Sequence, residues 1–192
     1  MYYNKVAIDS SLNAPSFYFP NVNQWVIFIK KGLSKKNEEF ISELNKTSSV
    51  KIHYFHDKGN DPINILKRSR QIEETLQFIL PQVEEVQIEG LSFGSNSLAS
   101  RQIAGFHYLV LNLFKNATKI TESAPSAVKK IFTGDGKAEK VDMINKFIET
   151  YTIDPELIVK ISEYMSNKTT KSIFKPIDDI VDSFAISKCG WE

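Results

Sequence analysis

Cysteine is nearly absent from this chain. Its 192 residues include one cysteine, Cys189, so no internal disulfide can form, and this usage is typical of a reducing compartment. The sequence also has no apolar run long enough to cross a bilayer, and its first residues lack the charged and apolar regions of a secretory signal. These absences predict a cytoplasmic protein with no membrane partner. They leave open whether a cell, a virus or a phage encodes it.

Arginine is scarce as well, and occurs only at Arg68, Arg70 and Arg101. Lysine supplies the other basic residues, and 24 basic side chains face 23 acidic ones, which leaves a net charge of +1. Such a balance does not by itself indicate a nucleic-acid binder. Any nucleic-acid surface must therefore be a local lysine cluster that contacts phosphates, because lysine lacks the forked guanidinium that reads base edges.

The pattern of apolar residues predicts a mixed α/β fold. Hydrophobic residues make up 42% of the chain, which is enough for a packed core. Strand-like patterns occur in six segments: residues 2–9, 17–20, 24–31, 50–55, 83–89 and 117–122. Helical spacing or helix-start signals mark six others: residues 35–45, 63–80, 97–114 and 137–151, and the stretches that begin at Pro155 and Pro176. Strands that come first and then alternate with helices predict one domain over residues 1–192, with helices covering a single sheet.

Two acidic residues end predicted strands. Asp9 follows the apolar run Val6-Ala7-Ile8, and Glu89 ends the strand at residues 83–89 in the same way. A lone aspartate at such a position is usually a turn former. If the two strands are neighbours, however, their acids lie roughly 5 Å apart, one inter-strand spacing. That separation suits metal ions that share ligands.

Two further acids lie near the C-terminus, one helical turn apart. Asp179 and Asp182 therefore face the same way, whereas Asp178 is expected to point elsewhere and to favour the helix N-terminus. Apolar neighbours on both sides predict that this helix is largely buried. Carboxylates gathered in a buried place repel one another unless a divalent cation lies between them. The four acids Asp9, Glu89, Asp179 and Asp182 thus predict a metal-dependent phosphodiesterase site.

Four stretches resemble the RuvC-like Holliday junction resolvases, a family of the RNase H-like superfamily. Residues 88–105 (IEGLSFGSN running into ASRQIAG) resemble the family's second catalytic acid, its junction-facing loop and the following helix. Residues 125–140 (PSAVKKIFTGDGKAEK) resemble its proline, lysine and Gly-x-Gly segment. Residues 7–12 and 179–185 supply the remaining acids. Together these stretches cover about half of the chain, in the family's order.

The resemblance implies an RNase H-like fold, with a mixed five-stranded sheet and helices on both faces. It also implies a homodimeric endodeoxyribonuclease that binds four-way DNA junctions and nicks two strands symmetrically. The acids would hold two Mg²⁺ ions, with Mn²⁺ as an alternative, since such hard ions prefer oxygen donors. Asp9 would bridge the ions, Glu89 and Asp182 would complete the two sites, and Asp179 would be a direct or a water-mediated ligand.

The resemblance also implies contacts with DNA. Lysines of the 125–140 segment would bind phosphates: Lys129, Lys130, Lys137 and Lys140. Phe93 is displaced by one position from the family's junction-wedging aromatic, so it is either the wedge or a buried core residue. Arg101 either contacts the DNA backbone or lies on the exposed face of its helix. Residues 151–175 resemble a helical insertion relative to compact family members.

The helix at residues 97–114 is the expected dimer interface, because Ala104 and Gly105 allow close approach of another element. His107, in the same helix, is expected to be packed or at a dimer contact rather than catalytic. Two alternative functions remain open at this point. One is a nuclease of the same fold that cuts flaps, branched replication intermediates or RNA–DNA hybrids. The other is a non-catalytic junction-binding protein, against which the four acids argue.

Overall fold

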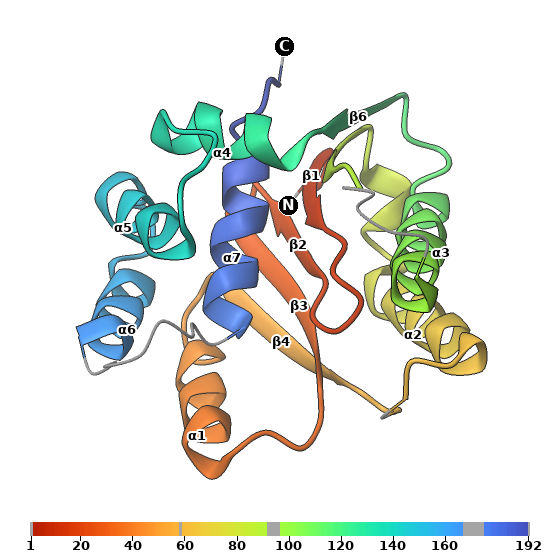
Figure 1. The fold of residues 1–192 in the computed structure, drawn as a ribbon, viewed down its shortest axis with the longest axis horizontal. Coiled ribbons are helices and arrows are strands. Elements are labelled where there is room, and N and C mark those ends of the chain that lie inside the picture. Colours follow the sequence, from red (N-terminus) through yellow and green to blue (C-terminus); the bar gives the residue numbers. More distant parts are fainter. Residues whose placement is uncertain (1, 58, 92–96, 167–174, 192) are drawn as a thin grey trace.

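The fold is built around one mixed sheet (Figure 1). The computed structural model describes residues 2–57, 59–91, 97–166 and 175–191. The strands are β1 (Lys5–Asp9), β2 (Ser16–Phe19), β3 (Gln24–Lys30), β4 (Val50–Phe55), β5 (Glu85–Glu89) and β6 (Lys119–Ser123). They lie in the order β4-β3-β2-β1-β5-β6. The chain begins near the middle of the sheet and then extends it on both sides, which brings β1 and β5 side by side.

The pairing of the strands is partly antiparallel and partly parallel. β1, β2 and β3 are joined antiparallel, whereas β5 pairs parallel to β1, β6 parallel to β5, and β4 parallel to β3. The five strands implied by the resemblance are therefore one too few. All six segments with strand-like patterns join the sheet, and β4, with its buried Val50 and Phe55, pairs beside β3 once the crossover through α1 (Lys35–Leu44) has returned the chain.

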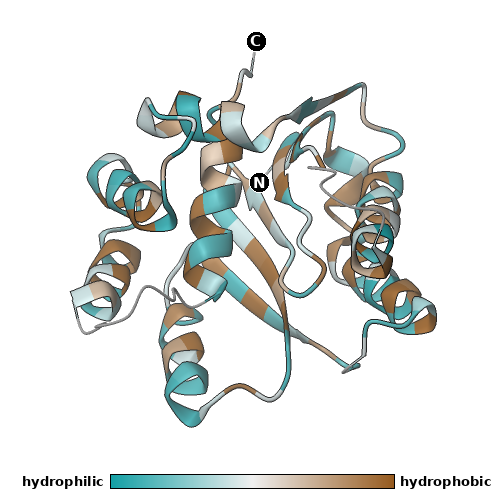
Figure 2. Ribbon diagram, in the orientation of Figure 1, coloured by the Kyte–Doolittle hydropathy of each residue, from teal (hydrophilic) through white to brown (hydrophobic). Residues whose placement is uncertain are grey.

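Helices cover both faces of the sheet, as predicted. They are α1 (Lys35–Leu44), α2 (Pro62–Leu76), α3 (Leu98–Leu113), α4 (Pro125–Thr133), α5 (Lys140–Thr150), α6 (Pro155–Ser166) and α7 (Lys175–Ile186), with a 3₁₀ turn, η1, at Leu80–Gln82. α2 and α3 pack on one face of the sheet, and α7 and α5 are among the helices on the other. Figure 2 shows hydrophobic residues alternating with hydrophilic ones along the helices, as expected of helices with one buried side.

The interior strand β3 shows why two separate cores form. Trp25 and Ile27 point into the core beneath α7, whereas Val26 and Phe28 point into the core beneath α2 and α3. Successive side chains of a strand alternate between faces, so a continuously apolar strand such as β3 can fill both cores. The sheet is consequently anchored on both sides, and its strand ends are fixed.

Polar side chains cap the two helices that cover one face of the sheet. Asp61 caps α2 by accepting from the backbone N–H groups of Ile63 and Asn64, and Ser97 caps α3. α6 occupies part of the predicted insertion at residues 151–175, of which 167–174 lie outside the described residues, so the insertion stays a prediction. In the part of the chain that the structure describes, no helix is long and apolar enough to cross a membrane.

Candidate active site

Asp9 and Glu89 end two adjacent strands of the sheet. Ile8 of β1 pairs with Ile88 of β5 in a parallel register, so the next residue of each strand is an acid at the same edge. Asp9 is only 9% exposed, and its Oδ1 accepts a hydrogen bond from the backbone N–H of Ser11 at 3.1 Å. The pairing of β1 with β5 therefore confirms that these two acids end neighbouring strands at one edge of the sheet.

Helix α7 brings two more acids to this edge. It packs across β1, β2, β3 and β5. Two polar contacts fix its position: the hydroxyls of Ser16 and Ser183 lie 2.9 Å apart, and Trp25 Nε1 donates to the carbonyl of Ile180 at 3.2 Å. Asp179 is only 1% exposed and Asp182 is half-buried. Two buried serines and an indole N–H thus hold α7 so that its acidic face meets the strand ends.

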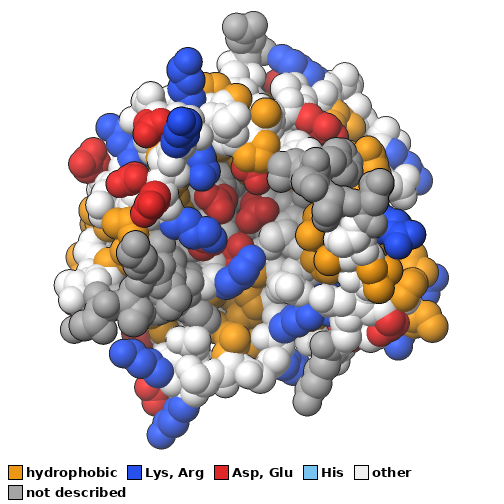
Figure 3. All heavy atoms as spheres, in the orientation of Figure 1, with side chains coloured by type: hydrophobic (Ala, Val, Ile, Leu, Met, Phe, Trp, Pro, Cys, Tyr) orange, Lys and Arg blue, Asp and Glu red, His pale blue; other side chains and the backbone are white. Residues whose placement is uncertain are grey.

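The four carboxyl groups perturb one another. Burial raises the pKa of Asp9 from 3.8 to about 6. Burial, reinforced by repulsion from Asp9, raises the pKa of Glu89 from 4.5 to about 7. Burial and repulsion from Asp9 also hold the pKa values of Asp179 and Asp182 well above 3.8. Figure 3 shows acidic side chains gathered in a hollow of the surface, with basic side chains along its rim. The structure thus brings all four predicted acids into one cluster.

Asp178 belongs to the same cluster, and the prediction that it points elsewhere is wrong. Its side chain is buried at 5% exposure and forms an ion pair with Lys140 of α5. Its charge raises the pKa values of Asp9 and Glu89. This contact could not be predicted from local patterns, because Asp178 and Lys140 lie 38 residues apart and only the packing of α5 against α7 joins them.

Three lysines border the acids. Lys140 pairs with Asp178, and Lys175 Nζ lies 3.9 Å from Asp179 Oδ1. Lys129 of α4 is half-buried, and its ammonium donates to the carbonyl of Ala138 at 2.9 Å. Lys129 also lies close enough to Glu89 to counteract part of the rise in its pKa. Positive charge therefore offsets some of the repulsion within the acidic cluster.

A cavity opens above Asp9 and Glu89. It has a volume of about 420 Å³, and its walls come from the turn after β1, the loop before α2, the loop after β5, and α3. Lys175 and Pro125 complete the lining. An acidic floor, with serine, amide and lysine side chains among its walls, is suited to a cation and an anionic ligand together.

The comparisons with known proteins point to one family. A family model described as crossover junction endodeoxyribonuclease RuvC matches residues 41–152, which is more than half of the chain. The chain belongs to the RuvC family. It is a crossover junction endodeoxyribonuclease, a metal-dependent hydrolase, as the sequence analysis predicted. The matched residues include Glu89 and the 125–140 segment, whereas Asp9 and the acids of α7 lie outside them. Asp9 and the acids of α7 reach the site through the register of β1 with β5 and the packing of α7 on the sheet.

Two solved structures are similar to this RuvC-family chain. One is RuvC of Thermus thermophilus, with 13% identity, 95% of this chain and 91% of that chain covered, and a TM-score of 0.47. The other is the yeast mitochondrial Holliday junction resolvase Ydc2, with 13% identity, 98% and 78% covered, and a TM-score of 0.48. No curated protein matches the chain.

The other residues predicted to bind DNA are spread over the surface of this RuvC-family protein. Lys130 and Lys137 are exposed on either side of the turn after α4, and Arg101 is exposed on α3. Gly134 ends α4 with a φ of +90°, a conformation that glycine adopts without strain. The backbone N–H of Lys137 donates to Asp135, which shapes the turn. Phe93 lies outside the described residues.

His107 is packed rather than exposed. It is 1% exposed, its Nδ1 lies 2.8 Å from Ser10 Oγ, and its Nε2 lies 3.3 Å from Glu122 Oε1. A carboxylate only accepts hydrogen bonds, so Nε2 carries the proton and donates to Glu122. The histidine therefore ties the residue after Asp9 to β6 on the far side of β5. Sequence reasoning foresaw a packed histidine, but not its contact beside the first acid.

The acidic cluster fits a hard divalent cation in its donor type. Its acidic side chains offer carboxylate oxygens as ligands, and Mg²⁺ and Mn²⁺ prefer oxygen ligands. Asp179 Oδ2 is buried and has no hydrogen-bond partner within the described chain, and a cation would offset that cost. Across the described residues, no three His, Cys, Asp or Glu side chains stand close enough to form a ready-made metal site. The cluster thus offers the type of ligand that such a cation prefers, but its carboxylates are not yet arranged around an ion.

Proposed function

We propose that this RuvC-family nuclease resolves four-way DNA junctions by paired, symmetric nicking at the acidic cluster. One observation carries this proposal: carboxylates from β1, β5 and α7 converge although the charge of Asp9 raises the pKa values of the acids on both β5 and α7. A fold gains no stability from gathering repelling acids in a buried place. Their convergence is explained when they bind divalent cations and, through them, a phosphate.

The residues that would hold Mg²⁺ are Asp9, Glu89, Asp179 and Asp182. A pair of Mg²⁺ ions (or Mn²⁺ ions) held by these residues would supply Lewis-acid stabilisation of the attacking and leaving oxygens in an in-line displacement at phosphorus. Asp9 is the proposed shared ligand, because it interacts with the acids of both β5 and α7. Lys140 and Lys175 limit the repulsion before a cation binds, and they can then pair with phosphate oxygens.

The DNA contacts are proposed on the side of α4 and α5. Lys129, Lys130, Lys137 and Lys140 come from this side and would contact backbone phosphates, which position a duplex without reading its sequence. Lys129 and Lys140 lie near the acids, so they would act on phosphates next to the cleaved bond. Arg101 and the Phe93 wedge remain predictions of the same kind.

Symmetric nicking needs two active sites, and α3 is the proposed dimer interface. Two of its exposed apolar side chains lie on the same side of the helix as Gly105: Leu98 (66%) and Tyr108 (60%). Gly105 lies on the exposed side as well, and a Cβ built on it meets no atom within 4 Å. An apolar helix face with a glycine near its centre allows two copies to approach closely.

Cleavage of matched substrates tests this function. The protein is incubated with a labelled four-way junction and with a linear duplex of the same arm sequence, with Mg²⁺ or with EDTA. We expect Mg²⁺-dependent nicks at symmetric positions of the junction only. Cleavage of flaps or RNA–DNA hybrids in preference to the junction would indicate the alternative nuclease function. Tight junction binding without cleavage under any metal would contradict the catalytic proposal.

A further inference from the structure

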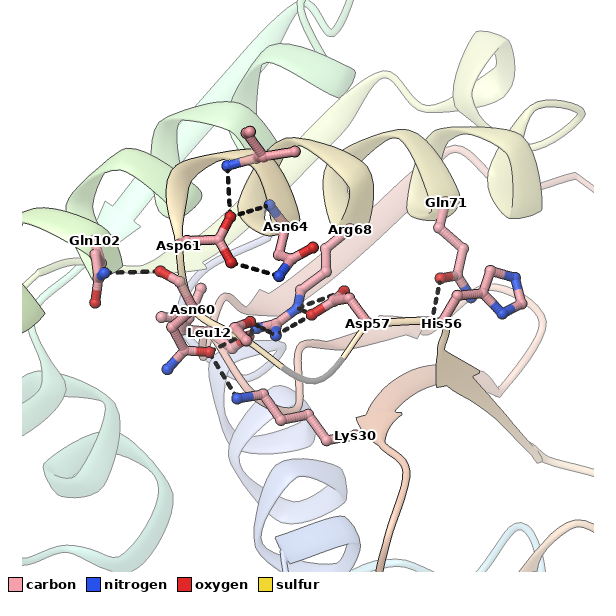
Figure 4. A network of polar contacts seen from close by, with 12 residues as sticks. Leu12, Lys30, His56, Asp57, Asn60, Asp61, Asn64, Arg68, Gln71 and Gln102 are labelled. Carbon is pink, nitrogen blue, oxygen red and sulfur yellow. Dashed lines mark hydrogen bonds and ion pairs between the residues drawn. The ribbon is translucent and has the colours of Figure 1, made fainter.

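A buried arginine organises one wall of the cavity above the acids. Arg68 of α2 is 0% exposed, and its Nε lies 3.0 Å from both carboxylate oxygens of Asp57. Its Nη1 donates to the carbonyl of Leu12 at 2.9 Å and to Asn60 Oδ1 at 3.1 Å, and its Nη2 donates to the carbonyl of Gly59 (Figure 4). One guanidinium thus joins the loop before α2 to the turn that follows Asp9.

These contacts fix the orientation of the Asn60 amide. Its Oδ1 accepts from Lys30 Nζ at 2.6 Å and from Arg68 Nη1 at 3.1 Å. Lysine and arginine have donors and no acceptor, so the oxygen of the amide must face them. Its backbone carbonyl is held in turn by Gln102 Nε2 of α3 at 2.7 Å. Figure 4 shows the amide nitrogen of Asn60 pointing away from both cations.

The amide nitrogen belongs to a residue that lines the site. Asn60 shares the cavity wall with Gln102, while Asp9 and Glu89 line the same cavity. Within the described residues, Asn60 Nδ2 donates to no other polar group, so its two N–H groups are available for a ligand. The amide is a neutral donor whose orientation is already fixed by Lys30 and Arg68. A ligand that accepts from it therefore loses no binding free energy to ordering this side chain.

We propose that Asn60 Nδ2 donates a hydrogen bond to a phosphate oxygen of the DNA strand held at the acidic cluster. This inference rests on the proposed function. The phosphodiester has acceptor oxygens and no donor, and the neighbouring carboxylates repel it unless a cation intervenes. A neutral donor beside them can orient the strand without competing for the cation. Asn60 is therefore a binding residue, and Arg68 and Lys30 are positioning residues that act through it.

Asn60→Asp is the sharpest variant, because it keeps the oxygen that Lys30 and Arg68 contact and replaces the two N–H groups with an acceptor. Junction affinity is measured in EDTA, KM in Mg²⁺ and Tm by thermal unfolding. We expect Tm to stay level or rise, while affinity falls and KM rises by about tenfold or more. Asn60→Ala removes the donors without adding charge, and it should also weaken binding severalfold.

Asn13→Asp is the matched control, because Asn13 is exposed and lines the same cavity, so it receives the same added charge. It should weaken binding less than Asn60→Asp does. Equal losses in Asn13→Asp and Asn60→Asp, or unchanged binding in Asn60→Ala, would overturn the role of Asn60 while wild-type cleavage of the junction stood. A wild type that neither binds nor cuts the junction would overturn this inference together with the proposed function.

Discussion

Replacing Asp9 with asparagine should stabilise the metal-free protein at alkaline pH. Burial raises the pKa of Asp9 from 3.8 to about 6. A raised folded-state pKa means that folding favours the protonated acid, so this group's stability is fully present below pH 3.8 and is lost as the pH rises through 6. At about 1.4 kcal/mol for each pH unit, the loss at pH 8 is about 3 kcal/mol. Asparagine never ionises, and its Oδ1 can still accept from Ser11.

The assay is urea denaturation in EDTA at pH 8 and at pH 4.5. The Asp9→Asn variant should exceed the wild type by about 2–3 kcal/mol at pH 8 and by roughly 1 kcal/mol at pH 4.5. Asp135→Asn, at an exposed position on the turn after α4, should show no such pH-dependent gain. An Asp9→Asn variant that is equally stable or less stable than the wild type at pH 8 would refute the claim that this carboxylate is held at a cost in stability.

Three other perturbations give separate tests. The Mg²⁺ concentration needed for half-maximal cleavage should fall as the pH rises from 6 to 8. Asp9 and Glu89 lose their protons near pH 6 and 7, and a carboxyl group binds a cation only when it is ionised. A Mg²⁺ requirement that does not change with pH would argue against these two residues as ligands. His107→Ala should lower the free energy of unfolding by roughly 2–4 kcal/mol in urea denaturation, because it leaves a cavity and a Ser10 hydroxyl without its partner. An unchanged free energy of unfolding would mean that the contact between His107 and Ser10 does not stabilise the fold. Gly105→Leu should give a folded monomer in analytical ultracentrifugation, and a persistent dimer would exclude this face of α3 as the interface.

Much of the acidic cluster could be predicted from the sequence because its members sit at recognisable local positions. Asp9 and Glu89 each follow an apolar strand, and strand ends of a parallel pair meet at one edge. Asp179 and Asp182 share a helix face by their spacing alone. The neighbouring acid Asp178 was misjudged, because its direction depends on an ion pair with Lys140 from another helix.

The fold shows the same division between local and long-range information. The strand segments are visible as apolar runs, but the place of β4 at the edge of the sheet depends on its parallel pairing with β3. α4 was not predicted as a helix, because it spans only nine residues and buries only Val128 and Phe132. Nothing in the sequence indicates that Asn60 meets Lys30 and Arg68, since that contact arises only when three separate segments pack together.

Neutralising the acids one at a time is the most direct test of the account. Single-turnover cleavage of a four-way junction in Mg²⁺ is compared for the wild type, Glu89→Gln, Asp182→Asn and the control Glu74→Gln, whose side chain is exposed on α2. We predict that the first two variants lose at least about a hundredfold in cleavage rate while still binding the junction, and that the control cuts as the wild type does. Wild-type cleavage rates in Glu89→Gln or Asp182→Asn would contradict the assignment of the acidic cluster as the active site.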